Sequence, residues 1–135
     1  MIIRKAKVND ITKLSILDKK AQKEMKTWFS QSEDNFKKSI KKENFYFLIG
    51  INEGKSIGYL ESEYDKKKDS VWIKNIYVLK EYRKKGIAKI FIRKCYQYWK
   101  NKTDLIVLLT ADRSLNIFEK LGFKKTMNYM VKVIK

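Results

Sequence analysis

The sequence predicts a single mixed α/β domain, and three observations lead to that prediction. The chain has 135 residues, which is enough for one ordinary hydrophobic core. Stretches of alternating or continuous apolar residues are followed by stretches in which apolar residues recur every three or four positions, so strands and helices alternate. The chain contains no proline, no low-complexity linker and no internal repeat, so residues 1–135 are expected to form one domain.

The beginning of the chain predicts a strand and a helix. Residues 2–3 are apolar and open a short strand. Asn9 or Asp10 can cap the helix, because short polar side chains accept hydrogen bonds from the first amides of a helix. The apolar positions that follow have a spacing of three and four residues. They are Ile11, Leu14, Leu17, Ala21 and Met25.

A second helix and a hairpin are expected next. Ser30 and Glu33 have the spacing of a capping box for a short helix that runs through Ile40. Residues 45–51 and 56–64 predict two strands, because an Asn-Glu-Gly turn sequence lies between two stretches rich in apolar residues. These two strands are expected to pair with each other.

The second half of the chain predicts a strand inside the sheet and an amphipathic helix. Residues 71–79 are apolar at both even and odd positions except at Lys74 and Asn75, which is typical of a strand covered on both faces. After Gly86 the apolar residues recur with helical spacing. They are Ile87, Phe91, Cys95, Tyr98 and Trp99.

The last part of the chain continues the alternation. Residues 105–109 predict a buried strand, and residues 112–121 predict a helix. Gly122 ends that helix, because glycine readily adopts the left-handed conformation found there. Residues 123–134 predict a closing strand. The expected order is therefore β-α-α-β-β-β-α-β-α-β, a mixed sheet with helices packed on it.

The net charge is the most unusual value in the composition. The chain has 32 Lys plus Arg against 15 Asp plus Glu, which gives +17, while 44% of its residues are hydrophobic. Such a chain is not a disordered basic tail. Only four of the cations are Arg, the residue that base recognition favours. Most of the charge is therefore interpreted as solvated surface, with a nucleic-acid-associated protein as the less favoured alternative.

The lack of His and the single Cys limit the catalytic mechanisms that the chain could use. The chain has no His and one Cys, Cys95, which excludes a Ser-His or Cys-His nucleophile and argues against a zinc site. Cys95 lies on an apolar helical stripe and is expected to pack in the core.

The longest apolar runs, 45–49 and 105–109, have five residues, against about 20 in a membrane span. With no membrane span and no signal peptide, a cytoplasmic protein is expected.

Residues 76–89 combine a buried strand, a basic loop, a glycine and the first turn of a helix. The first amides of a helix lack partners within it and lie at the positive end of its dipole, so they bind anions. Gly86 and Ala88 keep side-chain bulk away from an approaching phosphate. The positive side chains around them are Arg83, Lys84, Lys85 and Lys89. The segment predicts a phosphate site, and the alternative is a helix start with a solvated basic loop.

This segment resembles the acetyl-CoA motif of the GCN5-related N-acetyltransferases, the GNAT family. Arg83-x-x-Gly86-x-Ala88 follows a hydrophobic strand, as in that motif. Residues 118–123, Phe-Glu-Lys-Leu-Gly-Phe, are similar to the family's second signature, usually Tyr-Glu-x-x-Gly-Phe. One helix and one strand separate the two motifs, and the expected element order matches the family's along essentially all 135 residues.

The resemblance implies an acetyl-CoA-dependent N-acetyltransferase that needs no metal. A primary amine (a protein N-terminus, a lysine or a small molecule) would attack the thioester directly in a ternary complex. The backbone of residues 76–78 would pair with the pantetheine arm, and the amides of residues 84–89 would hold the pyrophosphate. The cofactor-binding residues implied in this way are Ile76, Tyr77, Val78, Arg83, Lys84, Lys85, Gly86, Ile87, Ala88 and Lys89.

Two positions depart from the family's pattern. The second signature usually begins with a Tyr whose hydroxyl protonates the leaving thiolate, and that position is Phe118 here. Where the family often places an Asn that touches the cofactor, this chain has Ala111. A thiol with a pKa of about 8.5 needs little acid assistance as a leaving group. An active enzyme is therefore expected, with a non-catalytic acyl-CoA-binding protein as the alternative.

The proton acceptor and the acceptor pocket are predicted from position. Many family members use a carboxylate on the central strand, but residues 71–79 contain none. Glu61 on the neighbouring strand is the candidate general base; the alternatives are an exposed strand carboxylate and a water chain in place of a base. Trp28 and Phe29 fall where the family shapes the acceptor entrance, so they are candidate acceptor-binding residues or else core residues. A homodimer is also consistent with the resemblance.

Overall fold

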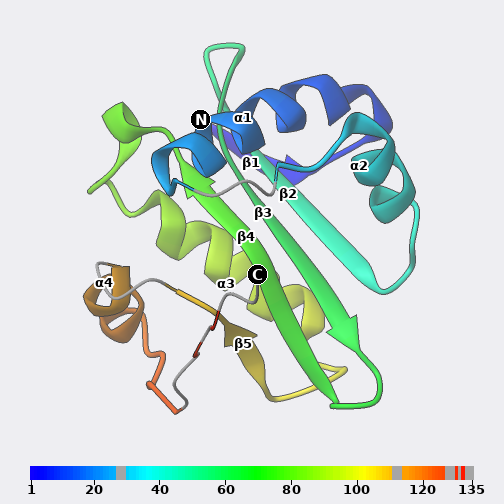
Figure 1. Ribbon diagram of the computed structural model, residues 1–135, viewed down its shortest axis with the longest axis vertical. Helices are drawn as coiled ribbons and strands as arrows, with labels where there is room; N and C mark the ends of the chain where they lie inside the picture. Colours follow the sequence, from blue (N-terminus) through cyan, green and yellow to red (C-terminus); the bar gives the residue numbers. More distant parts are fainter. Residues whose placement is uncertain (27–29, 111–113, 127–129, 131, 133–135) are drawn as a thin grey trace.

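The computed structural model describes residues 1–26, 30–110, 114–126, 130 and 132. Its centre is a five-stranded sheet in which the strands lie side by side in chain order (Figure 1). The strands are β1 (Ile2–Lys5), β2 (Phe45–Asn52), β3 (Lys55–Asp65), β4 (Ser70–Val78) and β5 (Ile106–Leu108). The helices are α1 (Ile11–Glu24), α2 (Glu33–Ile40), α3 (Ile87–Trp99) and α4 (Leu115–Lys120), with the 3-10 turns η1 (Val8–Asp10) and η2 (Lys80–Tyr82).

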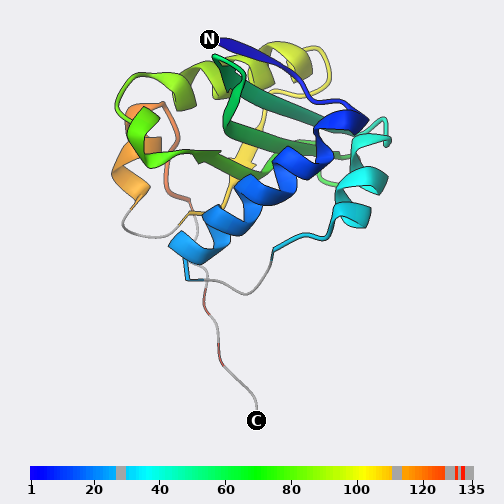
Figure 2. The ribbon, with the colours of Figure 1, turned by 90° about the horizontal axis from the view of Figure 1, so that it is seen from above.

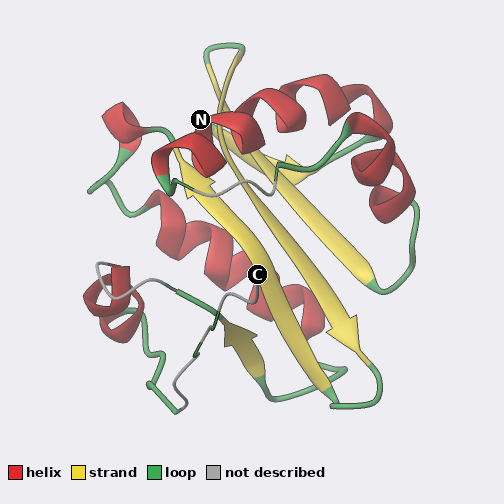
Figure 3. Cartoon of the chain, in the orientation of Figure 1, coloured by secondary structure: helices red, strands yellow, loops and turns green. Residues whose placement is uncertain are grey.

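The sheet has both antiparallel and parallel neighbours. β1 to β4 pair with one another in antiparallel order, and β4 pairs with β5 in parallel. The parallel pair is connected through α3, as a parallel pair requires. α1 and α2 lie on one side of the sheet and α3 on the other (Figures 2 and 3). This arrangement confirms the predicted fold class, a mixed α/β domain with one mixed sheet.

Two amphipathic helices close the core from opposite sides. The side chains that α1 and α3 bury are Ile11, Leu14, Leu17, Ala21, Ile87, Phe91, Cys95 and Trp99. Phe36 adds an aromatic ring from α2, and it packs edge to face against Phe47 at 6.1 Å and against Tyr59 at 6.5 Å. Burial of these side chains is the main favourable contribution to folding.

A glycine lets α3 approach the sheet closely. A Cβ at Gly58 of β3 would lie 2.5 Å from the Tyr77 carbonyl oxygen and 3.3 Å from the Phe91 ring. Any larger residue would therefore collide with the backbone of β4 and press on the Phe91 ring of α3. The start of α3, which follows the end of β4, is held against the sheet by this contact.

A buried ion pair connects β1 to the start of α1. The two terminal nitrogens of Arg4 donate to the carboxylate of Asp10 at 2.8 and 2.9 Å, and the Lys7 amide donates to the same carboxylate at 2.8 Å. The Asp10 side chain is only 2% exposed. The Arg4 hydrogen bonds keep the pKa of Asp10 below its usual range, because they favour the charged carboxylate. The Asp10 side chain therefore binds residues that precede α1, and it accepts no capping hydrogen bond from the first amides of that helix.

Three predicted boundaries are wrong. The cap of α2 is Ser32, whose hydroxyl accepts from the Asn35 amide at 3.1 Å, and not Ser30. β5 is shorter than predicted and half-buried, because it pairs with β4 on one side only. In the described part of the final segment, residues 123–126, 130 and 132, the chain forms no strand. The prediction for the rest of that segment lies outside the described residues.

Two side chains on the predicted helical stripes are exposed. Met25 follows the last turn of α1, beyond the sheet it was expected to cover, and is 43% exposed. Tyr98 is 45% exposed and stacks on Tyr46 at 3.7 Å. Its neighbour Trp99 takes the buried position, since a helix can point only one of two adjacent residues at the sheet.

We expect Asp10→Ala to lower the free energy of unfolding by about 2–3 kcal/mol at pH 7, because it removes three hydrogen bonds to a buried charge. The pKa of Asp10 is lower in the folded protein than in the unfolded one. Its contribution is therefore present above the unfolded pKa and is lost as the pH falls through the folded value.

Urea denaturation at pH 7 and pH 3 measures both effects. The difference between wild type and Asp10→Ala should shrink at pH 3. Glu43→Ala, at an exposed position, is the control and should change stability by less than about 0.5 kcal/mol. Equal losses for Asp10→Ala at the two pH values would contradict this assignment.

Candidate active site

β4 loses its neighbour half-way along its length. Its parallel pairing with β5 covers Val71 to Ile73 and ends at the pair Ile73–Leu108, whereas β4 itself continues to Val78. Beyond Ile73 the edge of β4 that faces β5 has no strand partner among the described residues, and the two strands separate (Figure 1). Such an edge offers backbone amides and carbonyls to an extended ligand that carries its own amides.

A β-bulge lies where the two strands separate. Glu61 of β3 is paired with Asn75, but the next residue, Ser62, is paired with Ile73, so Lys74 of β4 has no partner on β3. Bulges change the direction of a strand and re-aim its side chains, and they occur often beside active sites. The bulge places Glu61 and Asn75 beside the first unpaired residues of β4.

The loop after β4 has the backbone shape of an anion site. Lys84 has a φ of 62° and Gly86 a φ of 79°, while Lys85 between them is not in the left-handed region. Backbones that alternate in this way turn successive amide groups toward one point, which forms a concave site for an anion. No atom lies within 4 Å of a Cβ built at Gly86. The glycine is therefore favoured by its φ and not by packing.

The first turn of α3 adds further amide donors. Gly86 caps the helix, and the first helical hydrogen bond runs from the Ile90 amide to the Gly86 carbonyl at 3.2 Å. The amides of Ile87, Ala88 and Lys89 precede that bond and have no carbonyl of their own helix to bind. Ile87 is buried and anchors the turn, whereas Gly86 and Lys89 are exposed. The predicted phosphate site is thus open to solvent, and its ligand stays a prediction.

The Arg83 side chain points away from this site. Its Nε donates to the Val78 carbonyl at 2.9 Å, and its guanidinium forms an ion pair with Glu24 of α1 and lies 5.5 Å from the Tyr77 ring centre. The ion pair with Glu24 raises the pKa of Arg83. Arg83 therefore ties the end of α1 to the end of β4, and its predicted role in cofactor binding rests on its backbone.

A cleft of about 1240 Å³ lies between α3, β5 and α4. Lys89 and Arg93 of α3 line it on one side, and Phe118 of α4 lines it on the other. Phe118 is half-buried and packs edge to face against Phe123 at 6.0 Å. The second signature thus borders the same cleft as the first turn of α3, although Phe118 lies 29 positions after Lys89 in the chain.

Glu61 is buried on the α1 and α2 side of the sheet, with 2% of its surface exposed. Its Oε1 accepts two side-chain hydrogen bonds, from Gln31 Nε2 at 2.7 Å and from Asn75 Nδ2 at 2.8 Å. The alternative that Glu61 is an exposed strand carboxylate is wrong, because α1 packs on β3 and Gln31 lies against the carboxylate. The structure thus places a buried carboxylate beside the bulge, and its role as a general base stays a prediction.

Burial raises the pKa of Glu61, since the charged form loses solvation. The hydrogen bonds from Asn75 and Gln31 act in the opposite direction, because they favour the carboxylate. Among the charged neighbours, Lys74 lowers the pKa of Glu61 and Asp18 raises it. A carboxyl group whose pKa is raised toward neutrality is a better proton acceptor from an ammonium ion than an ordinary exposed Glu.

A second buried carboxylate supports the first. Asp18 of α1 accepts from Tyr59 Oη at 2.7 Å, from Gln22 Nε2 at 3.1 Å and from the Gln31 amide at 2.7 Å. Burial and the adjacent Asp18 carboxylate raise the pKa of Tyr59, so this phenol stays protonated. Asp18 is therefore a structural anchor, and Gln31 connects it to Glu61.

Cys95 is fully buried in α3, and burial raises its pKa to about 11. A thiol in this state is a poor nucleophile at neutral pH. The prediction that Cys95 packs in the core is confirmed.

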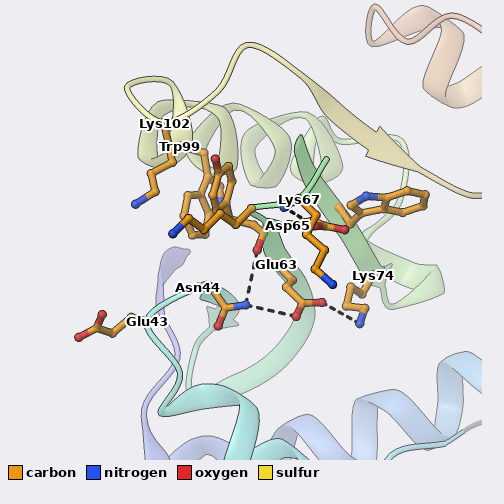
Figure 4. A pocket seen from close by; sticks show the side chains of 11 residues that line it. Glu43, Asn44, Glu63, Asp65, Lys67, Lys74, Trp99 and Lys102 are labelled. Carbon is orange, nitrogen blue, oxygen red and sulfur yellow. Dashed lines mark hydrogen bonds and ion pairs between the residues drawn. The ribbon is translucent and has the colours of Figure 1, made fainter. Parts of the chain in front are cut away.

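A second pocket, of about 900 Å³, lies at the opposite end of β3 and β4 (Figure 4). Its walls carry both charges: Asn44 Nδ2 donates to Glu63 Oε2 at 3.3 Å, and Lys74 Nζ lies 2.9 Å from Glu63 Oε1. Trp99 stacks on Tyr64 at 6.0 Å. The lining mixes carboxylates and lysines, of which Lys74 and Glu63 form an ion pair, and it does not include Glu61 or Gly86.

Some expectations fall outside what is described. Trp28, Phe29 and Ala111 lie outside the described residues, so the acceptor-binding prediction stays a prediction. Within the described residues, no group of three or more His, Cys, Asp and Glu could hold a metal ion, and no helix is long and apolar enough to span a membrane.

Residues 10–123 match the family model described as the Acetyltransferase (GNAT) family. The chain belongs to the GNAT acetyltransferase family. This confirms the resemblance drawn from the two motifs. No curated protein sequence matches this GNAT chain.

Solved structures share the fold at low sequence identity. The tetramutant of the BH1408 protein from Bacillus halodurans has a TM-score of 0.83 at 20% identity, with 99% of this chain and 100% of that chain covered. The aminoglycoside N-acetyltransferase AAC(6')-Iy in complex with CoA has a TM-score of 0.81 at 18% identity, with 99% and 94% covered. The aminoglycoside acetyltransferase meta-AAC0020, from an uncultured soil metagenomic sample and in complex with sisomicin, has 0.78 at 19%, with 99% and 96% covered.

Sequence reasoning missed the partners of Glu61. Gln31 lies 30 positions before it and Asn75 lies 14 positions after it. Asn75 carried one usable signal, since it is a polar residue inside an otherwise apolar strand. Gln31 and Asp18 carried none, because a polar residue in a loop or on a helix is ordinarily solvated.

We expect Gly86→Val to weaken acetyl-CoA binding at least roughly tenfold, or about 1.4 kcal/mol. A β-branched residue resists the left-handed φ that turns the amides toward one point, and its methyl groups would obstruct the ligand. Calorimetric titration of the folded variant with acetyl-CoA measures the loss.

Gly54→Val is the matched control. Gly54, in the turn between β2 and β3, has a φ of 78° and no atom within 4 Å of its Cβ position. Both variants should lose about 1–2 kcal/mol of stability from the same backbone strain, but Gly54→Val should bind acetyl-CoA as wild type does. Equal affinity in all three proteins would place the ligand elsewhere.

Proposed function

We propose that this GNAT protein is an acetyl-CoA-dependent N-acetyltransferase that moves the acetyl group to a primary amine by direct attack in a ternary complex. The observation that carries the proposal is the geometry of β4. Its unpaired edge leads directly into the amide-rich N-terminus of α3, and a buried carboxylate lies beside the point where that edge begins.

The residues present fit acetyl-CoA as the co-substrate. The pantetheine arm is an extended chain with two amides, and it would pair with the backbone of Ile76, Tyr77 and Val78. The pyrophosphate would be held by the amides that follow Lys84, with the Lys84, Lys85 and Lys89 ammonium groups nearby as exposed cations. AAC(6')-Iy, which shares this fold, has been solved with CoA bound.

Glu61 would act as the general base. An amine with a pKa of about 10.4 is neutral in only about one molecule in 2,500 at pH 7, so its ammonium form must lose a proton before attack. Glu61 would take that proton. The amine nitrogen then bonds to the acetyl carbon and the C–S bond breaks. As the amide forms, the nitrogen releases a second proton to solvent, and CoA leaves as a thiolate that takes a proton from solvent.

The leaving group needs no tyrosine in this scheme. Phe118 borders the cleft between α3 and α4 but carries no proton to donate. A CoA thiol with a pKa of about 8.5 is a good leaving group as its anion. The expected consequence is a slower enzyme and not an inactive one.

The acceptor class proposed first is a small-molecule amine. The structural neighbour meta-AAC0020 has been solved with sisomicin, and AAC(6')-Iy with a CoA-linked acetylneamine analogue. The net charge of +17 weakly repels polycations. A polyamine acceptor should therefore react faster as salt screens this repulsion.

The test is CoA release from acetyl-CoA in the presence of sisomicin, spermidine, or a peptide with a free α-amine and one lysine. Mass spectrometry of the product identifies the acetylated nitrogen. At least one amine should accelerate CoA release above the rate in buffer. Tight acetyl-CoA binding without acceleration by any amine would favour the alternative that Phe118 supports, a non-catalytic acyl-CoA-binding protein.

We expect Glu61→Gln to lower kcat at least about 100-fold, the scale of a lost general base, with an unchanged KM for acetyl-CoA. The substitution should not destabilise the fold. Because burial raises the pKa of Glu61, the charged carboxylate opposes folding at neutral pH, and the neutral amide removes that cost. Glu63→Gln, two residues further along β3, is the control and should keep wild-type kcat. A wild-type rate in Glu61→Gln would remove Glu61 from the mechanism.

We expect Phe118→Tyr to leave kcat unchanged or to raise it, because a phenol at this position could protonate the thiolate. Steady-state kinetics with the best acceptor at pH 7 checks this. Phe118 packs on Phe123, so the stability of the variant should be measured in parallel. A large fall in kcat with intact folding would show that this ring does not occupy the position of the family's tyrosine.

A further inference from the structure

We infer that Gln31 and Asn75 are positioning residues for Glu61. They hold its carboxylate through one oxygen, Oε1, and leave the other oxygen, Oε2, to meet the acceptor amine. This inference rests on the proposed function of the site and extends it to two residues that neither sequence motif contains.

The two donors approach the same atom from different parts of the fold. Gln31, in the segment between α1 and α2, donates from 2.7 Å, and Asn75 of β4 donates from 2.8 Å. Two donors on one oxygen fix the carboxylate's position and the rotation of its plane, which a single donor would not. Both donors are amides, which do not titrate, so the contacts do not depend on protonation of the donors.

The second oxygen of Glu61, Oε2, is not used by either of the two donors. Within the described residues Oε2 has no hydrogen-bond partner. Every side-chain oxygen or nitrogen there that is fully shut off from solvent has a partner, so Oε2 is not fully shut off. Oε2 therefore keeps a small contact with solvent, although Glu61 as a whole is only 2% exposed. An acceptor ammonium needs one charged oxygen within hydrogen-bond reach, and Oε2 supplies it.

Gln31 is itself fixed. Its backbone amide donates to Asp18 at 2.7 Å, and Asp18 is fixed in turn by Tyr59 and Gln22. This links the segment that carries Trp28 and Phe29 to the candidate base through a single residue. Binding of an acceptor against that segment would therefore be coupled to the position of Glu61.

The two hydrogen bonds to Glu61 should have a measurable effect on the pKa of its carboxyl group. Lys74 on β4, Asp18 on α1 and Tyr59 on β3 are the titratable groups that face Glu61, and none of them changes when an amide is replaced. Loss of either amide removes a hydrogen bond that favours the charged carboxylate, so the pKa of Glu61 should rise. A merely structural role in the sheet would change stability without moving that pKa.

The test uses Gln31→Met and Asn75→Leu, which remove the donors and keep most of the side-chain volume. The acceptor is whichever of sisomicin, spermidine and the peptide releases CoA fastest. With it, each variant should lose roughly tenfold in kcat, the scale of one hydrogen bond to a charged group. The KM for acetyl-CoA should stay unchanged. The acid limb of the kcat/KM profile should move to higher pH in both variants.

Asn44→Leu is the matched control. Asn44 donates its Nδ2 to Glu63 Oε2 at 3.3 Å, an Asn–Glu contact to the same strand in the second pocket, and it does not contact Glu61 (Figure 4). This control should keep the wild-type kcat and pH profile. If a Met or Leu variant does not fold, the corresponding alanine variant replaces it.

A second measurement separates this inference from the proposed function. Carbon NMR titration of the Glu61 carboxyl group, assigned by its absence in Glu61→Gln, gives its pKa without turnover. A higher pKa in Gln31→Met and Asn75→Leu supports the inference even if no panel amine is acetylated, an outcome that would overturn only the proposed function. An unchanged pKa and unchanged kcat in folded variants would overturn the inference and leave the proposed function intact.

Discussion

The separation of β4 from β5 is the constraint on which the rest of the site depends. Parallel pairing ends at Ile73–Leu108, and β4 continues to Val78. If the two strands paired along their full length, the edge of β4 would be satisfied and no extended ligand could join it. Because they separate, an open edge leads to the amides at the start of α3. The bulge at Lys74 lies directly beside the Glu61–Asn75 pair, where that edge begins.

Charge in this protein acts at two scales. The overall excess of +17 is carried by exposed lysines, and at physiological salt its reach is about 8 Å. The site itself contains a carboxylate in a buried polar cluster with a second carboxylate, Asp18. In the proposed function the acceptor would cross a repulsive surface to reach this buried carboxylate. The net charge alone does not describe the site, since it does not distinguish exposed lysines from a buried carboxylate.

Two side chains of the family motifs have tasks that differ from the expected ones. Arg83 is engaged with Glu24 and the Val78 carbonyl, so it stabilises the junction between α1 and β4. Phe118 packs on Phe123 at the edge of the cleft between α3 and α4. In both cases the backbone of the motif keeps its place in the fold while the side chain contributes to packing. Glu61, held by its two amide partners, is the residue proposed to accept the proton.

The sequence by itself determined the fold class, most element positions and the loop around Gly86. Periodicity and turn residues act over a few positions, and a left-handed glycine before a helix is a local feature. Only the tertiary structure decided that Glu61 is buried and that Gln31, Asn75 and Asp18 surround it, because those contacts join residues 13 to 41 positions apart. The same limit explains the missing strand in the described part of residues 123–132 and the exposed ends of residues 105–109. Hydrophobic pattern predicts which residues prefer burial, but pairing and cover are set by elements elsewhere in the chain.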